Sequence, residues 1–338
     1  MDRSLCKLQH ALSAYALNGR DAVIESSLPK NDHGDDHFKV KIGEKSYSAR
    51  FVSERRYNHD VFIPLTDEVL TEQMRFASFL SRNGIPFMRQ VPTAEGRDFG
   101  KLTWEGTRYR FLLFEWMEGR HITRCTGQAA HTFGVMVRQW HMLAADYASP
   151  LPQVSHRDGS LKFVAMLEQA SNAADSGCRG RLSAYLADAR KRIEHAFQSS
   201  REYIMQSDLN PLNILWDDRG KIVGIIDCEH IGYTERVEGL AWFIKWYSRT
   251  EGLSSHEVSA ELAASLLSGY GAEECLRRED WERLPSLLWL TGCLNWGFVQ
   301  KTLHLLNQSS QASTRRELDA HLAKYWERGE KLSALISD

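Results

Sequence analysis

The sequence predicts an α+β fold with two lobes, a small sheet-rich N-terminal lobe and a larger, mainly helical C-terminal lobe. Apolar and polar residues alternate with period two across residues 38–52, with a turn in the middle, which is the pattern of an antiparallel β-hairpin. Beyond Gly119, most of the chain instead shows apolar residues at helical spacing. We therefore expect residues 1–116 to form the N-terminal lobe and residues 117–338 to form the C-terminal lobe.

Helices and further strands are expected in the N-terminal part. Apolar side chains recur at helical spacing in residues 4–17 and again in residues 66–82. The second helix has a plausible start at Thr66-Asp67-Glu68 and a good stop at Asn83-Gly84. Short apolar runs predict three more strands, one that starts at residues 23–24 and two at residues 87–91 and 108–116.

The C-terminal part is predicted to be helical, with one β-rich interruption. Helical spacing is seen in residues 133–143 and 160–199 and from about residue 240 to the end. The pattern of residues 204–226 instead predicts short strands, and Asp217-Asp218-Arg219-Gly220 is predicted to form the turn of a hairpin. The apolar stretch 284–299 is read as a buried helix.

Bulk composition narrows the functional classes. The 338 residues carry a net charge of −2, which gives no broad basic field for nucleic acid. Six cysteines are spread along the chain without CxxC spacing, so neither a zinc site nor a disulfide framework is indicated. The N-terminus lacks the apolar core of a signal peptide, and residues 284–299 are too few to span a membrane. We expect a cytoplasmic protein that binds neither nucleic acid nor a membrane.

One short region carries residues suited to catalysis. Asp208 and Asn213 share a loop, and Asp227 follows the apolar run that ends the predicted hairpin. Phosphoryl transfer needs a carboxylate that orients the attacking hydroxyl and accepts its proton, and oxygen ligands that hold Mg²⁺ against the phosphates. Mg²⁺ prefers hard oxygen donors and keeps several waters, so one Asp and one Asn are enough. The alternative is that Asp208 and Asn213 merely cap turns.

At this point the chain resembles a known family. Asp208-x-x-x-x-Asn213, followed by Ile-Ile-Asp227-x-Glu229, is similar to the aminoglycoside phosphotransferase and choline kinase family, whose fold resembles that of the eukaryotic-type protein kinases. Weaker matches to other elements of the family occur in the same order as in that family, and the resemblance covers roughly residues 20–250. They are a third strand (47–51), a helix (72–84), an inter-lobe hinge (114–119) and a helix that ends in Leu-His (133–141). The resemblance implies a two-lobed, protein-kinase-like fold with the nucleotide between the lobes.

The resemblance also implies roles for the matched catalytic residues. Asp208 would be the catalytic base, and Asn213 and Asp227 would be the Mg²⁺ ligands. The family usually has His-Gly before the catalytic Asp, whereas this chain has Gln206-Ser207.

For the nucleotide, the resemblance points to the N-terminal lobe and the hinge. Arg50 would contact the α- and β-phosphates in place of the more common Lys, and Glu72 would pair with Arg50. The backbone of Glu115 and Met117 would meet the adenine edge.

Two features of the N-terminal lobe leave alternatives open. The residue that pairs with Arg50 depends on the helix register, so Glu68 or Gln73 could take the place of Glu72. The loop of residues 28–36 has one glycine and three acids, which argues against a role in covering phosphates.

Together these observations predict a kinase that transfers the γ-phosphate of ATP or GTP to a hydroxyl group of a small molecule. An aminoglycoside, an amino alcohol and a sugar are the leading acceptors, and the acidic residues of segment 251–280 would suit a cationic one. One rival is a protein Ser/Thr kinase, against which stands the lack of a long activation segment between Asp227 and the helix near Leu240. Another rival is a nucleotide-binding regulator without catalysis.

Overall fold

The structure is a computed structural model of the chain and has two compact units. Unit 1 consists of Met1–Arg120 and Val223–Glu229, and unit 2 consists of His121–Ile222 and His230–Asp338. The sequence pattern did not predict that residues 223–229 belong to unit 1. The described residues are 2–29, 34–54, 64–174, 176–198, 202–253, 255–308 and 312–336.

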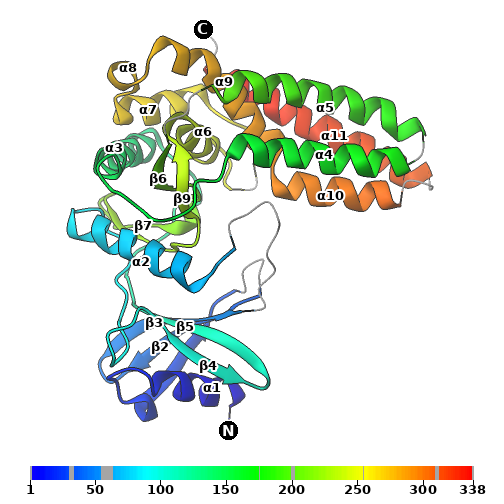
Figure 1. The fold of residues 1–338 in the computed structure, drawn as a ribbon. Helices are drawn as coiled ribbons and strands as arrows, with labels where there is room; N and C mark the ends of the chain where they lie inside the picture. Colours follow the sequence, from blue (N-terminus) through cyan, green and yellow to red (C-terminus); the bar gives the residue numbers. More distant parts are fainter. Residues whose placement is uncertain are drawn as a thin grey trace. The chain divides into compact units, whose positions relative to one another are not determined.

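Unit 1 contains a five-stranded antiparallel sheet with the strand order β1-β2-β3-β5-β4 (Figure 1). The hairpin expected at residues 38–52 is present, and Val40 lies opposite Tyr47 in its register. Gly43 in its turn has φ 59°, a left-handed conformation that glycine adopts without strain. The strands are β1 (Ala22–Ser27), β2 (Asp36–Ile42), β3 (Lys45–Ser53), β4 (Gly100–Trp104) and β5 (Thr107–Glu115).

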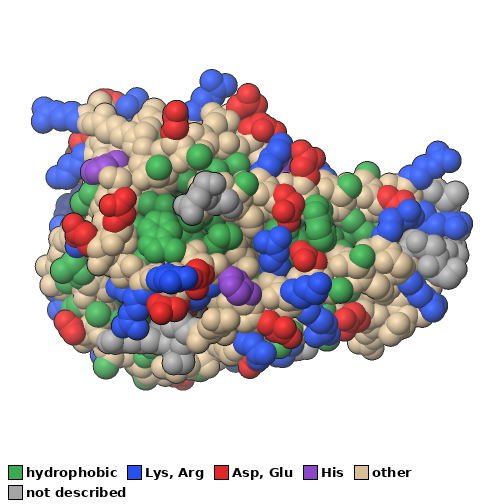
Figure 2. Space-filling model, turned by 90° about the horizontal axis from the view of Figure 1, so that it is seen from above, with side chains coloured by type: hydrophobic (Ala, Val, Ile, Leu, Met, Phe, Trp, Pro, Cys, Tyr) green, Lys and Arg blue, Asp and Glu red, His purple; other side chains and the backbone are tan. Residues whose placement is uncertain are grey.

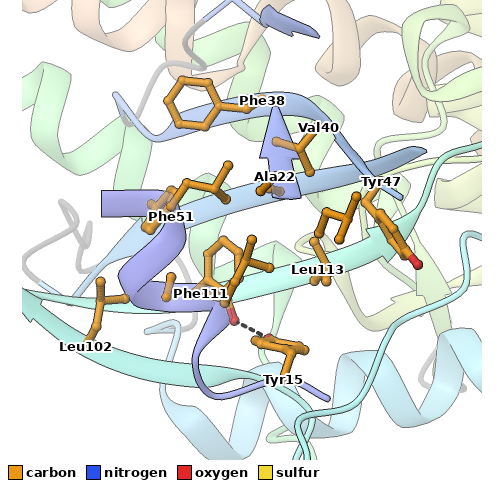
Figure 3. Packing of buried hydrophobic residues seen from close by; sticks show 14 residues of the cluster. Tyr15, Ala22, Phe38, Val40, Tyr47, Phe51, Leu102, Phe111 and Leu113 are labelled. Atoms are coloured by element: carbon orange, nitrogen blue, oxygen red, sulfur yellow. Dashed lines mark hydrogen bonds between the residues drawn. The ribbon is translucent and has the colours of Figure 1, made fainter. Parts of the chain in front are cut away.

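The core of unit 1 lies between this sheet and helix α1 (Arg3–Leu12) (Figure 3). Phe51 and Phe111 are fully buried, and their ring centroids lie 4.7 Å apart. Tyr15 packs edge-on against Phe111, and its hydroxyl donates a hydrogen bond of 2.8 Å to the Phe111 carbonyl. The helix predicted at residues 4–17 thus ends at Leu12 in the structure, but Tyr15, beyond its end, still contributes to the core.

The helix predicted at residues 66–82 is α2 (Asp67–Arg82). The Thr66 hydroxyl accepts a hydrogen bond from the Val69 backbone N–H, which is an N-cap. At the other end Asn83 is the C-cap, and Gly84 has φ 89°.

The prediction of a regular strand at residues 87–91 is wrong. Only isolated bridges occur there, which join Phe87 to Ile225 and Gln90 to Phe114. Pro86 and Pro92 flank the run, and proline has no N–H with which to extend a ladder. The sequence analysis missed β4, which pairs with β5 through a turn that contains Gly106.

In unit 2, helices α3 (Gly127–Ala144) and α7 (Ala260–Tyr270) pack at unusually short range. A Cβ atom on Gly134 would lie 2.2 Å from the Leu266 carbonyl oxygen, and one on Gly269 would lie 2.1 Å from the His131 carbonyl oxygen. Only glycine allows the two backbones to approach this closely. This packing holds α3 beside the strand β6 (Glu202–Gln206), from which the site loop emerges.

The remaining helices of unit 2 follow the predicted pattern, with one correction. Stretch 284–299 is divided between two helices, because α9 ends at Cys293 and α10 begins at Trp296 with Asn295 as its N-cap. In the described part of the chain, no helix is long and apolar enough to cross a membrane. These helices are α4 (His156–Ala173), α5 (Ser176–Ala196), α6 (Arg236–Tyr247), α8 (Ala272–Cys275), α9 (Arg278–Cys293), α10 (Trp296–Asn307) and α11 (Ala312–Ser333).

The β-rich interruption supplies the loop of the site. β6 pairs antiparallel with β9 (Ile231–Glu235), a strand that the sequence analysis missed. A short 3-10 helix, Pro211–Asn213, precedes β7 (Ile214–Trp216). The predicted turn then follows, closed by a hydrogen bond of 2.9 Å from the Asp217 N–H to the Lys221 carbonyl, and β8 (Ile222–Ile225) begins after it.

Candidate active site

Asp208 lies in the loop between β6 and the 3-10 helix of unit 2. Its backbone N–H donates a hydrogen bond of 3.1 Å to Oε1 of Gln206, a fully buried side chain. Its Oδ1 accepts a hydrogen bond of 2.9 Å from Nδ2 of Asn210. Both the backbone and the carboxylate of Asp208 are thus held by neighbours in the same loop.

Asn213 is joined to Asp208 directly. Its Nδ2 donates to the Asp208 carbonyl oxygen at 2.7 Å and lies 3.4 Å from Oδ2 of Asp208. Because both of these partners are acceptors, the amide nitrogen must face Asp208. The amide oxygen of Asn213 is then available for a ligand such as a cation.

Arg50 is the centre of an ionic cluster in unit 1. It lies on β3, and its Nη2 is 2.9 Å from Oδ2 of Asp35 and 2.7 Å from Oε1 of Glu229. Its Nη1 is 3.8 Å from Oδ1 of Asp227. Burial opposes the charge on Arg50, but Glu229, Asp227 and Asp35 together hold its pKa above the usual value. Arg50 thus gathers three carboxylates of unit 1 around one guanidinium.

Asp227 has a backbone conformation that few residues adopt. Its φ is 71°, in the left-handed region where Asp is one of the better tolerated residues after glycine. Its Oδ1 accepts a hydrogen bond of 2.9 Å from the Glu229 N–H, which closes a tight turn just after β8. This turn brings the carboxylates of Asp227 and Glu229 to the same guanidinium.

The helix residue expected to pair with Arg50 is placed differently from the prediction. Glu72 forms a two-point ion pair with Arg75, with distances of 2.6 and 3.0 Å. Gln73 instead donates from Nε2 to the Glu229 carbonyl oxygen at 2.8 Å, and so reaches the cluster around Arg50. Consecutive helix residues point about 100° apart, so an error of one position in register changes which side chain faces the sheet.

Glu115 is the last residue of β5, and Met117 lies two positions further along the chain, in the segment expected to be the hinge. The Glu115 N–H donates to the Arg89 carbonyl at 2.8 Å, so this donor is already used. Of the Glu115 backbone, only the carbonyl is left for the edge of a base. Trp116, between them, donates its N–H to the Ser46 carbonyl at 3.1 Å, which ties the segment to the start of β3.

A model of the family described as "Phosphotransferase enzyme family" matches residues 30–286. The chain belongs to this phosphotransferase family. It is therefore a phosphotransferase with an alcohol group as acceptor, and a regulator without catalysis is not favoured. No curated protein sequence matches the chain.

Solved structures agree on the fold of this phosphotransferase. The microcompartment-associated aminopropanol kinase is 17% identical, with a TM-score of 0.68 over 99% of this chain and 98% of that one. An amicoumacin kinase, solved in complex with AMP-PNP, Ca²⁺ and Ami, is 16% identical, with a TM-score of 0.66 over 97% of this chain and 94% of that one. A spectinomycin phosphotransferase, solved with ADP and spectinomycin, is 14% identical, with a TM-score of 0.59 over 98% and 96%. The α+β, protein-kinase-like fold is thus confirmed.

The unusual Gln206 of this phosphotransferase has a structural explanation. It occupies the place where the family usually has His, and its Oε1 caps the backbone N–H of Asp208. A buried amide acceptor can therefore hold the loop without an imidazole.

Three residues of the site were not predicted, and each had some signal. Glu229 lies two positions after Asp227 in the motif, Asp35 was noticed only as an unfavourable loop acid, and Gln73 was the alternative register. In the same loop, Asp32 lies outside the described residues.

Proposed function

We propose that the protein transfers the γ-phosphate of ATP, or of GTP, to a hydroxyl group of a small molecule, with Mg²⁺ as cofactor. The observation that carries this proposal is the loop in which Asn213 and Asn210 hold the Asp208 carboxylate. A carboxylate fixed in this way can orient a hydroxyl and accept its proton. In the described part of the chain no cation forms an ion pair with Asp208, so its charge is not already neutralised.

The residues assigned to Mg²⁺ fit this ion chemically. We assign the Asn213 amide oxygen and the Asp227 carboxylate as its protein ligands, both of them hard oxygen donors. In the described residues no group of three or more His, Cys, Asp or Glu side chains is placed to hold a metal ion. Mg²⁺ at kinase sites commonly takes one or two protein ligands and completes its shell with phosphate and water. When bound, the ion would offset negative charge on the phosphates.

Arg50 is the residue we assign to the nucleotide phosphates, and the adenine edge to the backbone at Glu115 and Met117. Arg50 keeps a full positive charge at any working pH, and its fork geometry suits phosphate oxygens. Asp35 occupies the same guanidinium at 2.9 Å. A bound triphosphate would therefore compete with Asp35 for Arg50.

This competition makes opposite predictions for two variants. Arg50→Met should weaken nucleotide binding by about tenfold or more, which is the loss of at least ~1.4 kcal/mol. Asp35→Asn removes a negative charge next to the phosphates and should tighten binding by roughly two- to fivefold, the factor that corresponds to ~0.5–1 kcal/mol. Isothermal titration of both variants with ATP and Mg²⁺ measures the two effects. If Asp35→Asn also weakened binding, Asp35 would support the nucleotide site rather than compete with it.

The short connection after Asp227 favours a small acceptor over a protein. Strand β9 begins at Ile231 and helix α6 follows at Arg236, so no long activation segment is present there. The similar structures are named for small acceptors, namely aminopropanol, amicoumacin and spectinomycin. The proposed reaction needs ATP, and the described part of the protein contains free cysteines, so we place the protein in the cytoplasm.

A turnover assay tests the proposed function. Purified protein should release nucleoside diphosphate from ATP or GTP in the presence of Mg²⁺ and the correct hydroxyl compound. Its melting temperature should rise with nucleotide plus Mg²⁺, because binding to the folded state stabilises it. The proposal fails if neither nucleotide shifts the melting temperature at any Mg²⁺ concentration.

A further inference from the structure

A cluster of cations in unit 2 lacks the partners that buried charges normally have. Lys245 on α6 is 4% exposed, and Arg249, one helical turn further along the chain, is 7% exposed. Arg328 on α11 is half-buried, and its charge lowers the pKa of both Lys245 and Arg249. We call these three residues the cation cluster.

The other buried cations of the described chain are all paired with carboxylates. Arg283 contacts Glu235 at 2.7 Å, Lys7 contacts Asp36 at 2.9 Å, and Arg110 contacts Asp67. In the cation cluster, by contrast, no described carboxylate lies within ion-pair distance of Lys245, Arg249 or Arg328. Removing a charge from water without a partner is costly, and like charges next to one another increase that cost.

Aromatic rings supply part of the missing stabilisation. The Lys245 ammonium lies 4.2 Å from the ring centre of Trp242 and 4.8 Å from that of Trp246. The Arg249 guanidinium lies 4.4 Å from the ring centre of Trp246. Cation–π contacts of this kind contribute about 0.5–2 kcal/mol, less than burying a cation costs. The rings therefore order the cations but do not neutralise them.

The same segment contains hydrogen-bonding atoms that have no partner. Nε1 of Trp246, Oγ of Ser248 and Nδ1 of His256 are buried without a hydrogen bond in the described part of the chain. The loop that carries His256 folds back on the end of α6, because Arg249 bridges to Val258. Groups of this kind offer hydrogen-bond donors and acceptors to a ligand that reaches this segment.

The cluster also lies in the field of the proposed base. The pKa of Lys245 is lowered first by burial and then by the charges of Arg328 and Arg249. The next largest effect comes from the charge of Asp208, which raises this pKa. Lys245 and Asp208 belong to the same unit, so their proximity does not depend on how the two units are arranged.

From these contacts we infer that the cation cluster binds an anionic group of the acceptor. The acceptor class is then a small molecule that carries both a hydroxyl and a carboxylate or phosphate. The anionic group would offset the charges of Lys245, Arg249 and Arg328, and the hydroxyl of the same molecule would meet Asp208. This inference rests on the proposed function, because it names the substrate class of the same site.

The acidic segment that suggested a cationic acceptor does not oppose this conclusion. Three of its acids pair with cations of the chain itself, since Glu257 contacts Lys331, Glu274 contacts Arg138 and Asp280 contacts Arg283. Figure 2 shows a face of the molecule on which acidic and basic side chains are interspersed rather than separated. Such a surface has no strong field of one sign.

A binding experiment with matched compounds tests the inference without requiring turnover. The probes are glycerate against glycerol, homoserine against its amide, and glycerol 3-phosphate against glycerol, with inorganic phosphate and sulfate as simple anions. The anionic member should bind wild-type protein at least tenfold more tightly by calorimetry. The carboxylate and phosphate arms distinguish the two kinds of anion. The inference is wrong if no anion binds at millimolar concentration, or if charged and uncharged members bind equally.

Two variants separate ligand binding from structure. Lys245→Met keeps the length of the side chain but removes the unpaired charge, so the anion preference should disappear while the melting temperature rises. Lys301→Met is the control, because Lys301 is exposed and paired with Glu317, and both properties should stay as in wild type. A lower melting temperature in Lys245→Met with the anion preference intact would show that the cluster only supports packing.

A parallel assay distinguishes failure of the inference from failure of the proposed function. If ATP and Mg²⁺ bind, but neutral or cationic hydroxyl compounds are the better acceptors, the kinase proposal stands and the anionic acceptor is rejected. If anions bind through Lys245 but no nucleotide binds, the anion site is confirmed and the kinase proposal is rejected. If Lys245→Met weakens nucleotide binding and leaves the anion preference unchanged, the cluster serves the nucleotide and the inference is wrong.

Discussion

Asp208→Asn should lower kcat by about 10²–10⁴ while leaving nucleotide binding close to wild type, because the substitution keeps the shape of the side chain and removes the proton acceptor. The loose transition state of phosphoryl transfer places the loss towards the lower end of this range. Steady-state turnover and isothermal titration with ATP and Mg²⁺ measure the two parts separately.

The neighbours of Asp208 add a small structural effect to this variant. Both carboxylate oxygens face amide donors, one from Asn210 and one from Asn213. The new amide group must turn its NH₂ towards one of them, so a modest fall in melting temperature is expected. Asp217→Asn is the matched control, because Asp217 only accepts hydrogen bonds from Arg219 and Lys221 in the nearby turn. Wild-type turnover in Asp208→Asn would remove Asp208 from the role of base.

Asp227→Asn should have a different signature, in which transfer is abolished and Mg²⁺-dependent nucleotide binding is lost. The reason is that Asp227 is assigned to the metal, whereas Asp208 is assigned to the acceptor. Asn is the suitable replacement, because it tolerates the φ of 71° and can still accept from the Glu229 N–H. Titration with ATP, with and without Mg²⁺, should show that added Mg²⁺ no longer strengthens binding by the tenfold or more expected of wild type, equivalent to ~1.4 kcal/mol.

The loss of one carboxylate beside Arg50 needs its own check. Arg50 keeps Asp35 and Glu229 as partners in Asp227→Asn, so its ion pairs and the fold should survive. The melting temperature without ligand tests this, with Asp217→Asn again as the comparison. Normal Mg²⁺-dependent binding in a folded Asp227→Asn protein would contradict the metal assignment.

The parts of the site that sequence reasoning found are those encoded by a short motif. Asp208 and Asn213 are five positions apart in one loop, so their contact follows from local geometry. The pairing of Glu72 with Arg50 depends instead on the helix register and on a contact between residues far apart in the sequence. In the structure Gln73 reaches the cluster and Glu72 pairs with Arg75. The loop acid Asp35 could not be assigned from the pattern, since its contact depends on how the loop folds back to β3.

The fold was predictable where periodicity was strong and failed where turns decide the outcome. The hairpin of β2 and β3 and the helix α2 follow from period and capping residues. Strands β4 and β9 have only five residues each, too few for a strong periodic signal, and prolines prevent a regular strand at residues 87–91. The cation cluster was not predicted, because Lys245 and Arg328 are far apart in sequence and influence one another only in the folded unit.

The path of the chain through residues 223–229 limits how the protein can be divided. A fragment that ends at Arg120 would lack Asp227 and Glu229, and Arg50 would lose two of its three carboxylates. The same fragment would lack Ile225, whose backbone bonds to Pro86 and Met88. Unit 1 therefore cannot be transferred as one continuous segment. Its exchange between members of the family would require two separate segments to be grafted together.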